Sequence, residues 1–300
     1  MKILITGSTG LLGQALVKRF APPYDVVGLS RHASSPGNPG QHVLCDLTQR
    51  EATQRVIRAV NADVVIHTQA LSDVDRCEQE PHQADLCNRQ TTEHLCTILR
   101  DTNTVLITVS TDYVFDGRKG SPYHEEDEPH PISVYGRSKL AGERATLRYP
   151  RGYVVRPSTL FGPGRMNFCN AIVQHLQRDE PIEAFMDQTT SPTYTEDLAQ
   201  GLCRVVELMG REDLSRLPRV YHLANAGSCS RVEFAQCVVR LLGGNDALIR
   251  AIPMAQQRRP APRPASSALI SRYQQQVLGW SLRSWQDAVR AYLASQAWLN

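Results

Sequence analysis

Tyr135 and Lys139 are the most chemically informative pair of residues in the sequence. They stand four residues apart in a stretch whose pattern predicts a helix over Ser133–Tyr149. Residues i and i+4 share one face of a helix, so the lysine ammonium is expected beside the phenol. A nearby positive charge favours the phenolate and lowers the tyrosine pKa from about 10, which suits proton transfer to a carbonyl oxygen.

A threonine precedes this pair at the end of an apolar run. Thr111 lies in the tripeptide Ser110-Thr111-Asp112, directly after a predicted strand at Val105–Val109. In an open parallel sheet, ligands bind beyond the carboxyl ends of the strands. We therefore expect Thr111 to donate a hydrogen bond to the substrate oxygen.

A glycine-rich loop follows the first predicted strand, Lys2–Ile5, and precedes a predicted helix at Leu11–Phe20. Gly7 permits a tight turn, Gly10 lets the backbone approach a pyrophosphate, and Gly13 lets the helix pack closely on the strand. The free N–H groups and the dipole at the helix start favour an anion. The loop therefore predicts a dinucleotide-binding site.

The end of the second predicted strand, Val26–Leu29, indicates which dinucleotide binds. Ser30-Arg31-His32 follows it, with no carboxylate for the ribose 2′-hydroxyl of NAD. The Arg31 guanidinium suits a 2′-phosphate, because it makes a bidentate, charge-assisted contact. We predict NADPH, with NADH left open. Asp46 is expected either to accept from the adenine amino group or to cap the next helix.

Short apolar strands alternate with longer helical patterns over the first 160 residues, and helical stretches dominate after Pro157. This alternation predicts an α/β fold with a Rossmann-like, doubly wound parallel sheet over residues 1–160, the NADP-binding domain. A smaller, mostly helical C-terminal substrate lobe over 161–300 is expected to interleave with it through a return strand at Tyr221–Leu223. The Pro-rich segment Gln256–Ser267 is expected to be an exposed, extended connector. The other predicted strands are Val43–Leu44, Val64–His67 and Val154–Val155, and the other predicted helices are Gln49–Val60, Pro81–Arg100, Phe168–Gln177, Thr195–Met209, Arg231–Leu242 and Arg283–Ala294.

The composition excludes several classes of protein. With 41 % apolar and 21 % charged residues the chain is of ordinary globular type, and its 33 basic and 30 acidic residues give a net charge of only +3. No basic block suggests a nucleic-acid or membrane partner, and no apolar run reaches the roughly 18 residues that a membrane span needs. The eight cysteines are scattered, so we expect reduced thiols, no metal site and a cytoplasmic chain.

The segment STDYVFDG at Ser110–Gly117 and the block Pro122–Glu143 closely resemble dTDP-4-dehydrorhamnose reductases, which belong to the extended short-chain dehydrogenase/reductase superfamily. Later segments are similar too: Arg156-Pro157-Ser158, Asp187-Gln188 followed by the run Ser191–Ala199, and Arg263-Pro264 with Ser267. The resemblance implies an NADPH-dependent reductase of a nucleotide-linked 4-keto-6-deoxy sugar. It also implies that Thr111, Tyr135 and Lys139 form the catalytic triad.

The resemblance assigns further residues to the site. Gly7, Gly10, Leu11 and Leu12 would lie along the pyrophosphate, Arg31, Asp46 and Leu47 at the adenosine end, Thr68, Gln69 and Ala70 along the inner half of the cofactor, and Thr111 and Asp112 against the sugar.

The sequence departs from the family pattern in two segments. Thr68 and Gln69 stand where the family usually has alanines, and Thr159 stands where it often has a tryptophan that walls the deoxysugar. Thr159 is expected to contact the substrate, and it offers less apolar wall than tryptophan. The change therefore leaves the identity of the sugar open.

Two alternatives remain open. The regulatory β-subunit of methionine adenosyltransferase resembles this family and acts as a binding protein, but its segment typically lacks the threonine that this chain has at position 111. The other alternative is a sugar-nucleotide epimerase or dehydratase of the same superfamily. The sequence also leaves open whether the chain forms a homodimer.

Overall fold

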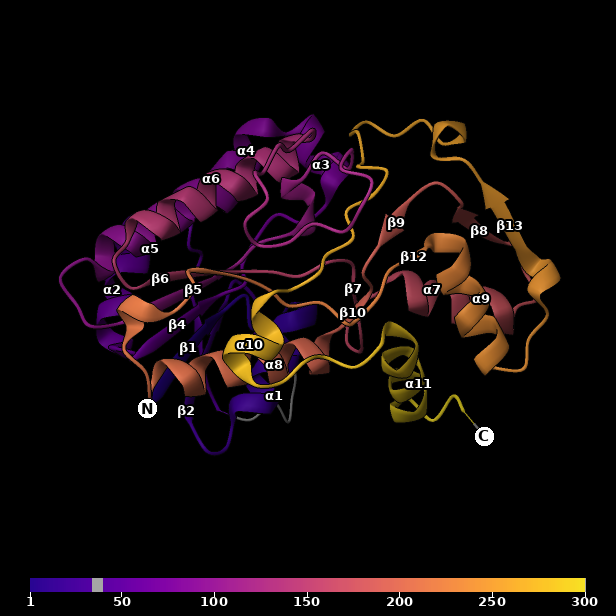
Figure 1. The fold of residues 1–300 in the computed structure, drawn as a ribbon. Coiled ribbons are helices and arrows are strands. Elements are labelled where there is room, and N and C mark those ends of the chain that lie inside the picture. The colour runs from indigo at the N-terminus through magenta and orange to yellow at the C-terminus, as the bar shows by residue number, and fades with distance from the viewer. Residues whose placement is uncertain (34–39, 300) are drawn as a thin grey trace.

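A parallel β-sheet of seven strands forms the centre of the computed structural model, which describes residues 1–33 and 40–299. The strand order is β11-β6-β5-β4-β1-β2-β3, and every neighbouring pair is parallel. The order reverses between β1 and β4, which predicts a ligand crevice at the carboxyl ends of these strands. The Rossmann-like, doubly wound prediction is confirmed (Figure 1). The strands are β1 (Lys2–Thr6), β2 (Asp25–Ser30), β3 (Gln41–Leu44), β4 (Val64–His67), β5 (Val105–Val109), β6 (Gly152–Arg156) and β11 (Val220–His222).

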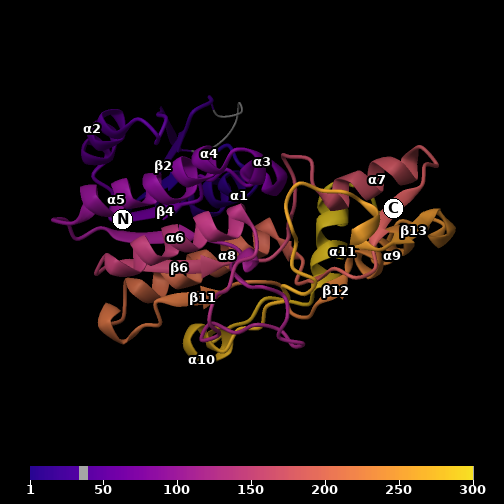
Figure 2. The same cartoon turned by 90° about the horizontal axis from the view of Figure 1, so that it is seen from above.

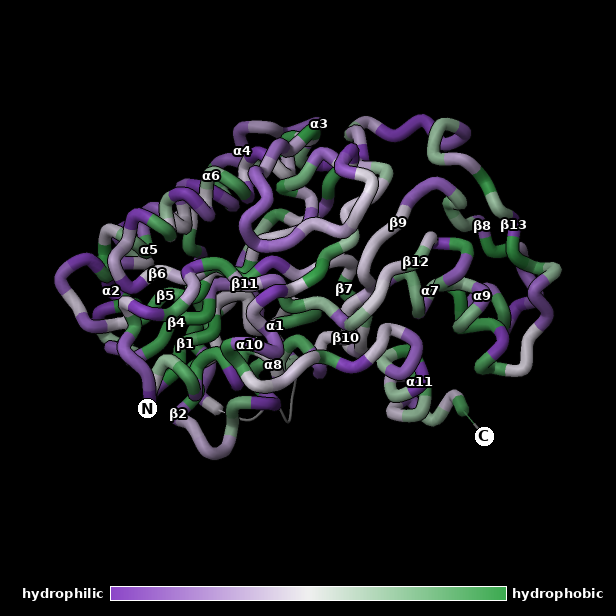
Figure 3. The backbone as a smooth tube through the Cα atoms, viewed as in Figure 1, coloured by the Kyte–Doolittle hydropathy of each residue, from purple (hydrophilic) through white to green (hydrophobic). Residues whose placement is uncertain are grey.

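Helices cover both faces of the sheet, so its strands carry apolar residues on both sides. Ile3 and Ile5 of β1 belong to the core under α1, α8 and α10, whereas Leu4 packs with Ile57 of α2 in the opposite core. Successive strand residues point to opposite faces, which is why the sequence showed no polar face. The central strands are accordingly coloured as hydrophobic in Figure 3. One layer contains α1 (Leu11–Phe20), α8 (Thr195–Met209) and α10 (Tyr273–Leu278), and the other contains α2 (Arg50–Val60), α3 (Val74–Gln79), α4 (Pro81–Asp85), α5 (Thr91–Leu99) and α6 (Val134–Arg148).

A second lobe lies beside the sheet and has its own aromatic core (Figures 1 and 2). Phe161, Tyr194, Phe234 and Tyr292 pack together between its helices. Its longest strands, β8 and β13, form a parallel pair that the sequence did not predict. The elements are β7 (Leu160–Phe161), α7 (Phe168–Gln177), β8 (Ile182–Phe185), β9 (Thr189–Thr190), β10 (Thr193–Tyr194), β12 (Cys229–Ser230), α9 (Arg231–Leu241), β13 (Ile249–Ile252) and α11 (Trp285–Ser295).

The chain passes between the two lobes more than once. β11 pairs with β6 in the main sheet, which confirms the predicted return strand, and α8 covers the same face as α1. Both elements come after residue 160. A division into residues 1–160 and an interleaved 161–300 remains a proposal.

The prediction of an exposed connector at Gln256–Ser267 is wrong for its second half. The Arg263 guanidinium forms two hydrogen bonds to the Asp75 carboxylate, at 2.5 and 2.7 Å, and the Ala261 amide donates to the same carboxylate. Ala261 and Ser267 are buried. The segment therefore runs as a strap from the second lobe to α3 (Figure 1). Its proline content predicts an extended backbone, but only the tertiary structure supplies the surface that covers it.

No helix in the described part of the chain combines the length and the apolar character that crossing a membrane requires.

Candidate active site

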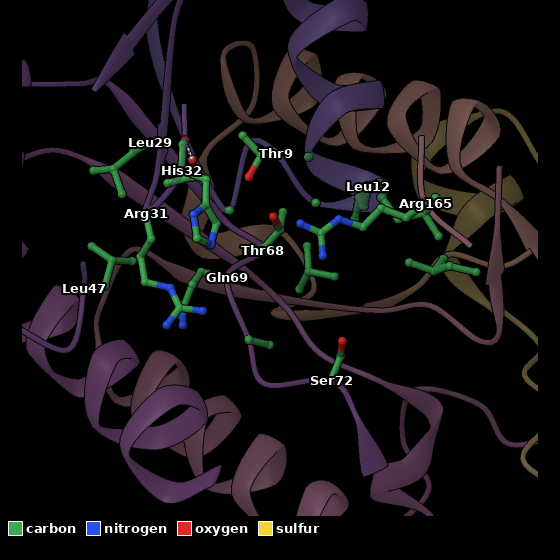
Figure 4. Close-up of a pocket in the computed structure, with 18 of the residues that line it drawn as sticks. Thr9, Leu12, Leu29, Arg31, His32, Leu47, Thr68, Gln69, Ser72 and Arg165 are labelled. Carbon is green, nitrogen blue, oxygen red and sulfur yellow. Dashed lines mark hydrogen bonds between the residues drawn. The ribbon is translucent and has the colours of Figure 1, made fainter. Parts of the chain in front are cut away.

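A cavity of about 730 Å³ opens at the carboxyl edge of the sheet, where the strand order reverses (Figure 4). It is lined by the glycine loop, by the ends of β2, β4 and β5, by the loop after β3 and by the start of α6. All the residues that the sequence assigned to the cofactor line this one cavity. They are Gly7, Gly10, Leu11, Leu12, Gly13, Arg31, Asp46, Leu47, Thr68, Gln69, Ala70, Tyr135 and Lys139.

The glycine loop packs closely against the end of β4 and the start of α1. Gly7 has a φ of +69°, and a Cβ there would lie 2.8 Å from the Gln69 backbone nitrogen. A Cβ on Gly13 would lie 2.2 Å from the Gly7 carbonyl oxygen. The Thr68 hydroxyl donates to the Thr6 carbonyl at 2.6 Å and so fixes the loop from the β4 side. Gly10 caps α1 without a side chain, which leaves the first N–H groups of the helix open to an anion.

The adenosine end of the cavity is held by local hydrogen bonds. The Ser30 hydroxyl contacts the His32 carbonyl at 2.5 Å and His42 at 3.1 Å. One Asp46 carboxylate oxygen accepts from the backbone amide and hydroxyl of Thr48, at 2.9 and 2.8 Å. The alternative prediction that Asp46 caps the next helix is therefore wrong, since α2 has Gln49 at its N-cap. The contact of Asp46 with adenine stays a prediction.

Two buried polar atoms beside the cavity have no hydrogen-bond partner among the described residues. They are the Gln69 Oε1 and the Ser110 Oγ, and both residues line the cavity. Buried polar groups are rarely left without a partner in native proteins. A polar ligand in this cavity would satisfy them, which fits a dinucleotide. Across residues 1–33 and 40–299, no group of three His, Cys, Asp or Glu side chains is placed to hold a metal ion.

Tyr135 and Lys139 occupy the first turns of α6. Ser133 caps this helix by accepting from the Gly136 amide at 3.1 Å, which fixes where it begins. The Lys139 ammonium donates to the Val109 carbonyl at the end of β5, at 2.7 Å. Burial lowers the pKa of Lys139 to about 8, and the Glu143 carboxylate opposes this decrease.

The Tyr135 phenol has a raised pKa in the protein alone. Burial is the main cause, and a hydrogen bond with the Thr111 hydroxyl opposes the increase. The predicted lowering of this pKa by Lys139 is therefore wrong for the protein without ligands. The phenolate loses its hydration on burial, and the hydrogen bond with Thr111, rather than the Lys139 ammonium, is what opposes the increase.

Thr111 and Asp112 lie in a buried hydrogen-bond network. One Asp112 carboxylate oxygen accepts from the hydroxyls of Ser158 and Ser267, at 2.7 and 2.6 Å, and the other accepts from Thr111 at 3.1 Å. The Tyr113 amide donates to the Thr111 hydroxyl at 3.2 Å. The Asp112 carboxylate thus joins the ends of β5 and β6 to the strap, and it fixes the Thr111 side chain through a hydrogen bond. Contacts of Thr111 and Asp112 with a sugar stay predictions.

Thr159 adopts a backbone conformation that is unusual for a β-branched residue. Its φ is +33°, and its carbonyl accepts from the Thr193 amide at 2.9 Å. Such conformations cost free energy and often mark functional sites. Thr159 does not line the cavity of about 730 Å³, whereas its neighbours Pro157 and Leu160 do. Its contact with the substrate stays a prediction.

Three polar residues at the junction of the lobes were not predicted. Gln188 donates to the Tyr113 hydroxyl at 3.1 Å and accepts from the Arg231 guanidinium at 3.4 Å. The Tyr113 ring centre lies 6.0 Å from that of Tyr135, and Arg231 stacks over Phe168. Burial lowers the pKa of Arg231. Within the part of the chain that is described, no carboxylate forms an ion pair with Arg231. Gln188 belongs to a segment that resembles the family, but no local pattern marks Arg231.

The comparisons with known proteins extend over the whole chain. The family described as the RmlD substrate binding domain matches residues 1–297. A dTDP-4-dehydrorhamnose reductase of Mycobacterium tuberculosis (strain ATCC 25618 / H37Rv) is 36 % identical over 304 residues, which cover 99 % of this chain and 93 % of that protein. One from Mycolicibacterium smegmatis is 34 % identical over 297 residues, covering 98 % and 85 %.

A solved structure is similar over the same length. The dTDP-4-dehydrorhamnose reductase of Bacillus anthracis, in complex with NADP, has a TM-score of 0.86 and 27 % identity, and the match covers 98 % of this chain and 99 % of that one.

Proposed function

The chain belongs to the family of the RmlD substrate binding domain, and on this premise we propose that it is an NADPH-dependent reductase of a nucleotide-linked 4-keto-6-deoxy sugar. One observation carries the proposal: Tyr135 and Lys139 open onto the same cavity as the glycine loop. A proton donor thus stands beside a dinucleotide site, which is the arrangement that carbonyl reduction needs. The relatives named dTDP-4-dehydrorhamnose reductases support dTDP-4-dehydrorhamnose as the first substrate to test.

NADPH would lie with its diphosphate on the glycine loop and the start of α1, and with its adenosine end toward Arg31 and Asp46. The NADP complex of the Bacillus anthracis relative supports this choice of cofactor. Gln69 and Ser110 would supply hydrogen-bond partners along its inner half. When bound, the cofactor supplies the hydride for the carbonyl carbon.

The side chains of this protein would handle the proton and the carbonyl oxygen. Tyr135 gives its phenolic proton to the oxygen as negative charge develops there. Lys139, anchored on the Val109 carbonyl and one helical turn from Tyr135, would favour the phenolate that results. Thr111 would orient the carbonyl group by turning its hydroxyl, which donates to Asp112 in this structure, toward the substrate oxygen.

Arg231 and Gln188 would bind the nucleoside diphosphate of the substrate. Arg231 is the first residue of α9, it stacks on the first residue of α7, and no carboxylate among the described residues forms an ion pair with it, although the charge of Asp112 acts on it. A guanidinium in this state favours an anionic partner, because its burial without one is costly. The diphosphate of a nucleotide sugar has the charge that this position needs.

A turnover assay tests the proposed function. The purified chain is given NADPH and a panel of dTDP-, UDP- and GDP-linked 4-keto sugars, and the loss of NADPH absorbance is followed. We expect turnover with at least one dTDP-linked sugar, and formation of the reduced sugar nucleotide in equal amount. NADPH binding without turnover on any sugar would contradict the proposal and favour a binding protein.

Three wider predictions stay proposals. Binding of the nucleotide sugar is tested by calorimetry with dTDP as the probe. A homodimer is tested by light scattering of the full chain in solution, and a cytoplasmic location by cell fractionation.

A further inference from the structure

A second guanidinium enters the cofactor cavity, and neither the motifs nor the resemblance assigned it. Arg165 belongs to the loop between β7 and α7, and it lines the cavity together with Met166 and Leu160. Figure 4 shows its guanidinium directed into the cavity beside Leu12, whereas Arg31 enters at the other end. The two arginines therefore enter one cavity from different sides.

The loop that carries Arg165 is fixed against the dinucleotide-binding helix. Gly164 has a φ of +96°, and a Cβ there would lie 2.8 Å from the Gln14 side-chain oxygen of α1. Gln14 in turn donates to the Thr9 carbonyl in the glycine loop, at 3.0 Å. The Asn167 amide, at the N-cap of α7, donates to the carbonyls of Gly162 and Arg165 at 2.7 and 3.0 Å. These contacts hold the Arg165 backbone next to the glycine loop.

Most of the other charged groups that line the cavity have hydrogen-bond partners within the protein, and Arg31 lies at the adenosine end. Lys139 donates to a backbone carbonyl, Asp46 accepts from Thr48, and Asp73 caps α3 by accepting from the Arg76 amide. In the described residues, the Arg165 guanidinium forms no ion pair or hydrogen bond with any side chain or carbonyl, although its own carbonyl is held by Asn167. Arg165 is thus a cation available to a ligand of this cavity.

A dinucleotide phosphate has two separate anionic groups, the diphosphate at its centre and the 2′-phosphate at its adenosine end. Arg31 stands at the end assigned to adenosine, so it faces the 2′-phosphate. Arg165 stands by the start of α1, where the glycine loop and open N–H groups favour the diphosphate. A guanidinium binds phosphate oxygens in bidentate geometry, which the helix start alone does not provide.

We infer that Arg165 binds the diphosphate of the cofactor together with the glycine loop and the start of α1. The inference rests on the proposed use of NADPH, and it adds a residue from the second half of the chain to the cofactor site. Cofactor binding would then connect the loop before α7 with the glycine loop before α1.

The two arginines are expected to differ in which cofactor they affect. NADH and NADPH share the diphosphate, but only NADPH has the 2′-phosphate. Arg165→Gln is therefore expected to weaken both cofactors by the same factor, roughly 5- to 30-fold, in line with hydrogen bonds to charged groups. Arg165→Lys keeps the charge but loses the bidentate geometry, so its effect should be smaller.

Fluorescence titration of the full chain with NADH and with NADPH measures this difference. The variants are Arg165→Gln, Arg165→Lys and a matched control, Arg178→Gln, which removes an exposed arginine at the far end of α7, about 15 Å along the helix. We expect the control to bind both cofactors like the wild type. Arg165→Gln should also flatten the salt dependence of binding for both cofactors.

Two results would overturn the inference. If Arg165→Gln binds both cofactors like the wild type, Arg165 is only a solvated arginine at the cavity mouth. If it loses affinity for NADPH alone, the residue binds the 2′-phosphate instead. Failure of the proposed function is a separate result: a wild-type chain that binds neither cofactor refutes both ideas, whereas equal losses without any sugar turnover support Arg165 and refute the reductase.

Discussion

The cofactor half of the site and the junction between the lobes are built in different ways. In the cofactor half, short contiguous segments at the ends of β1, β2 and β4 line the cavity, and its shape depends mainly on the backbone of these segments. At the junction, single side chains meet from distant positions: Asp112 with Ser267 across 155 residues, and Gln188 with Tyr113 across 75. The difference teaches that local turns shape most of the cofactor cavity, whereas the proposed sugar site would depend on long-range hydrogen bonds between side chains.

The two regions are joined at Thr111 and Tyr135. The Thr111 hydroxyl donates a hydrogen bond to Asp112, which belongs to the junction, and Tyr135 lines the cofactor cavity. Variants of the cofactor half should therefore change cofactor affinity, and variants of the junction should change turnover while cofactor affinity stays the same.

The largest expected effect is at the residue where the two regions meet. Tyr135→Phe keeps the ring and its packing but removes the proton that is transferred. We expect kcat to fall by roughly 10²-fold or more, the range for general acid catalysis, while the Kd for NADPH stays near the wild-type value. Single-turnover kinetics and a binding titration measure the two quantities. Wild-type turnover by the Phe variant, with hydride transfer limiting the rate, would remove Tyr135 from the mechanism.

The pH dependence of turnover is expected to report Lys139. Burial lowers the pKa of Lys139 to about 8 in the protein alone, so its ammonium is lost as the pH rises through that value. Because the ammonium favours the phenolate that forms at Tyr135, kcat/KM should fall by about tenfold for each pH unit above this pKa. Lys139→Arg keeps its charge across the range, so its residual activity should lack this decrease. A decrease at the same pH in the Arg variant would assign the titration to another group.

A variant of the cofactor half alone should change the preference for NADPH over NADH. Arg31→Asp is expected to weaken NADPH binding by roughly 5- to 30-fold, in line with hydrogen bonds to charged groups, and to leave NADH affinity similar or better. Titrations with both cofactors give the ratio of the two Kd values. An unchanged ratio would show that Arg31 is a solvated surface residue.

The smallest expected effect comes from a single hydroxyl of the junction. Ser267→Ala removes one of the two hydrogen bonds to the same Asp112 carboxylate oxygen and costs about 1 kcal/mol, or roughly fivefold in kcat if Thr111 loses its position. NADPH affinity should not change. The neighbouring Ser266→Ala is a matched control, because the Ser266 hydroxyl forms no hydrogen bond among the described residues. A lower NADPH affinity in Ser267→Ala would contradict the separation of the two regions.

Local sequence determined most of the first lobe. The strand at Val105–Val109 and the helix at Thr195–Met209 have the predicted bounds, and the glycine loop lies where its spacing required. Apolar runs, helix caps and glycine spacing each act over a few residues, so they can be interpreted without knowledge of the rest of the chain. The same reasoning identified Tyr135 and Lys139, because a helix brings residues i and i+4 together.

Only the tertiary structure decided the rest of the site. The pairing of β8 with β13, the attachment of Arg263 to Asp75 and the approach of Arg165 to the glycine loop each depend on a surface supplied by a distant segment. A short strand or a charged side chain has no local preference strong enough to indicate its partner, because ordering it costs free energy that only the packed partner offsets. The sequence by itself therefore determined which residues are candidates for proton transfer, Tyr135 and Lys139, while the packing of the two lobes decided that Arg165 lines the cavity onto which they open.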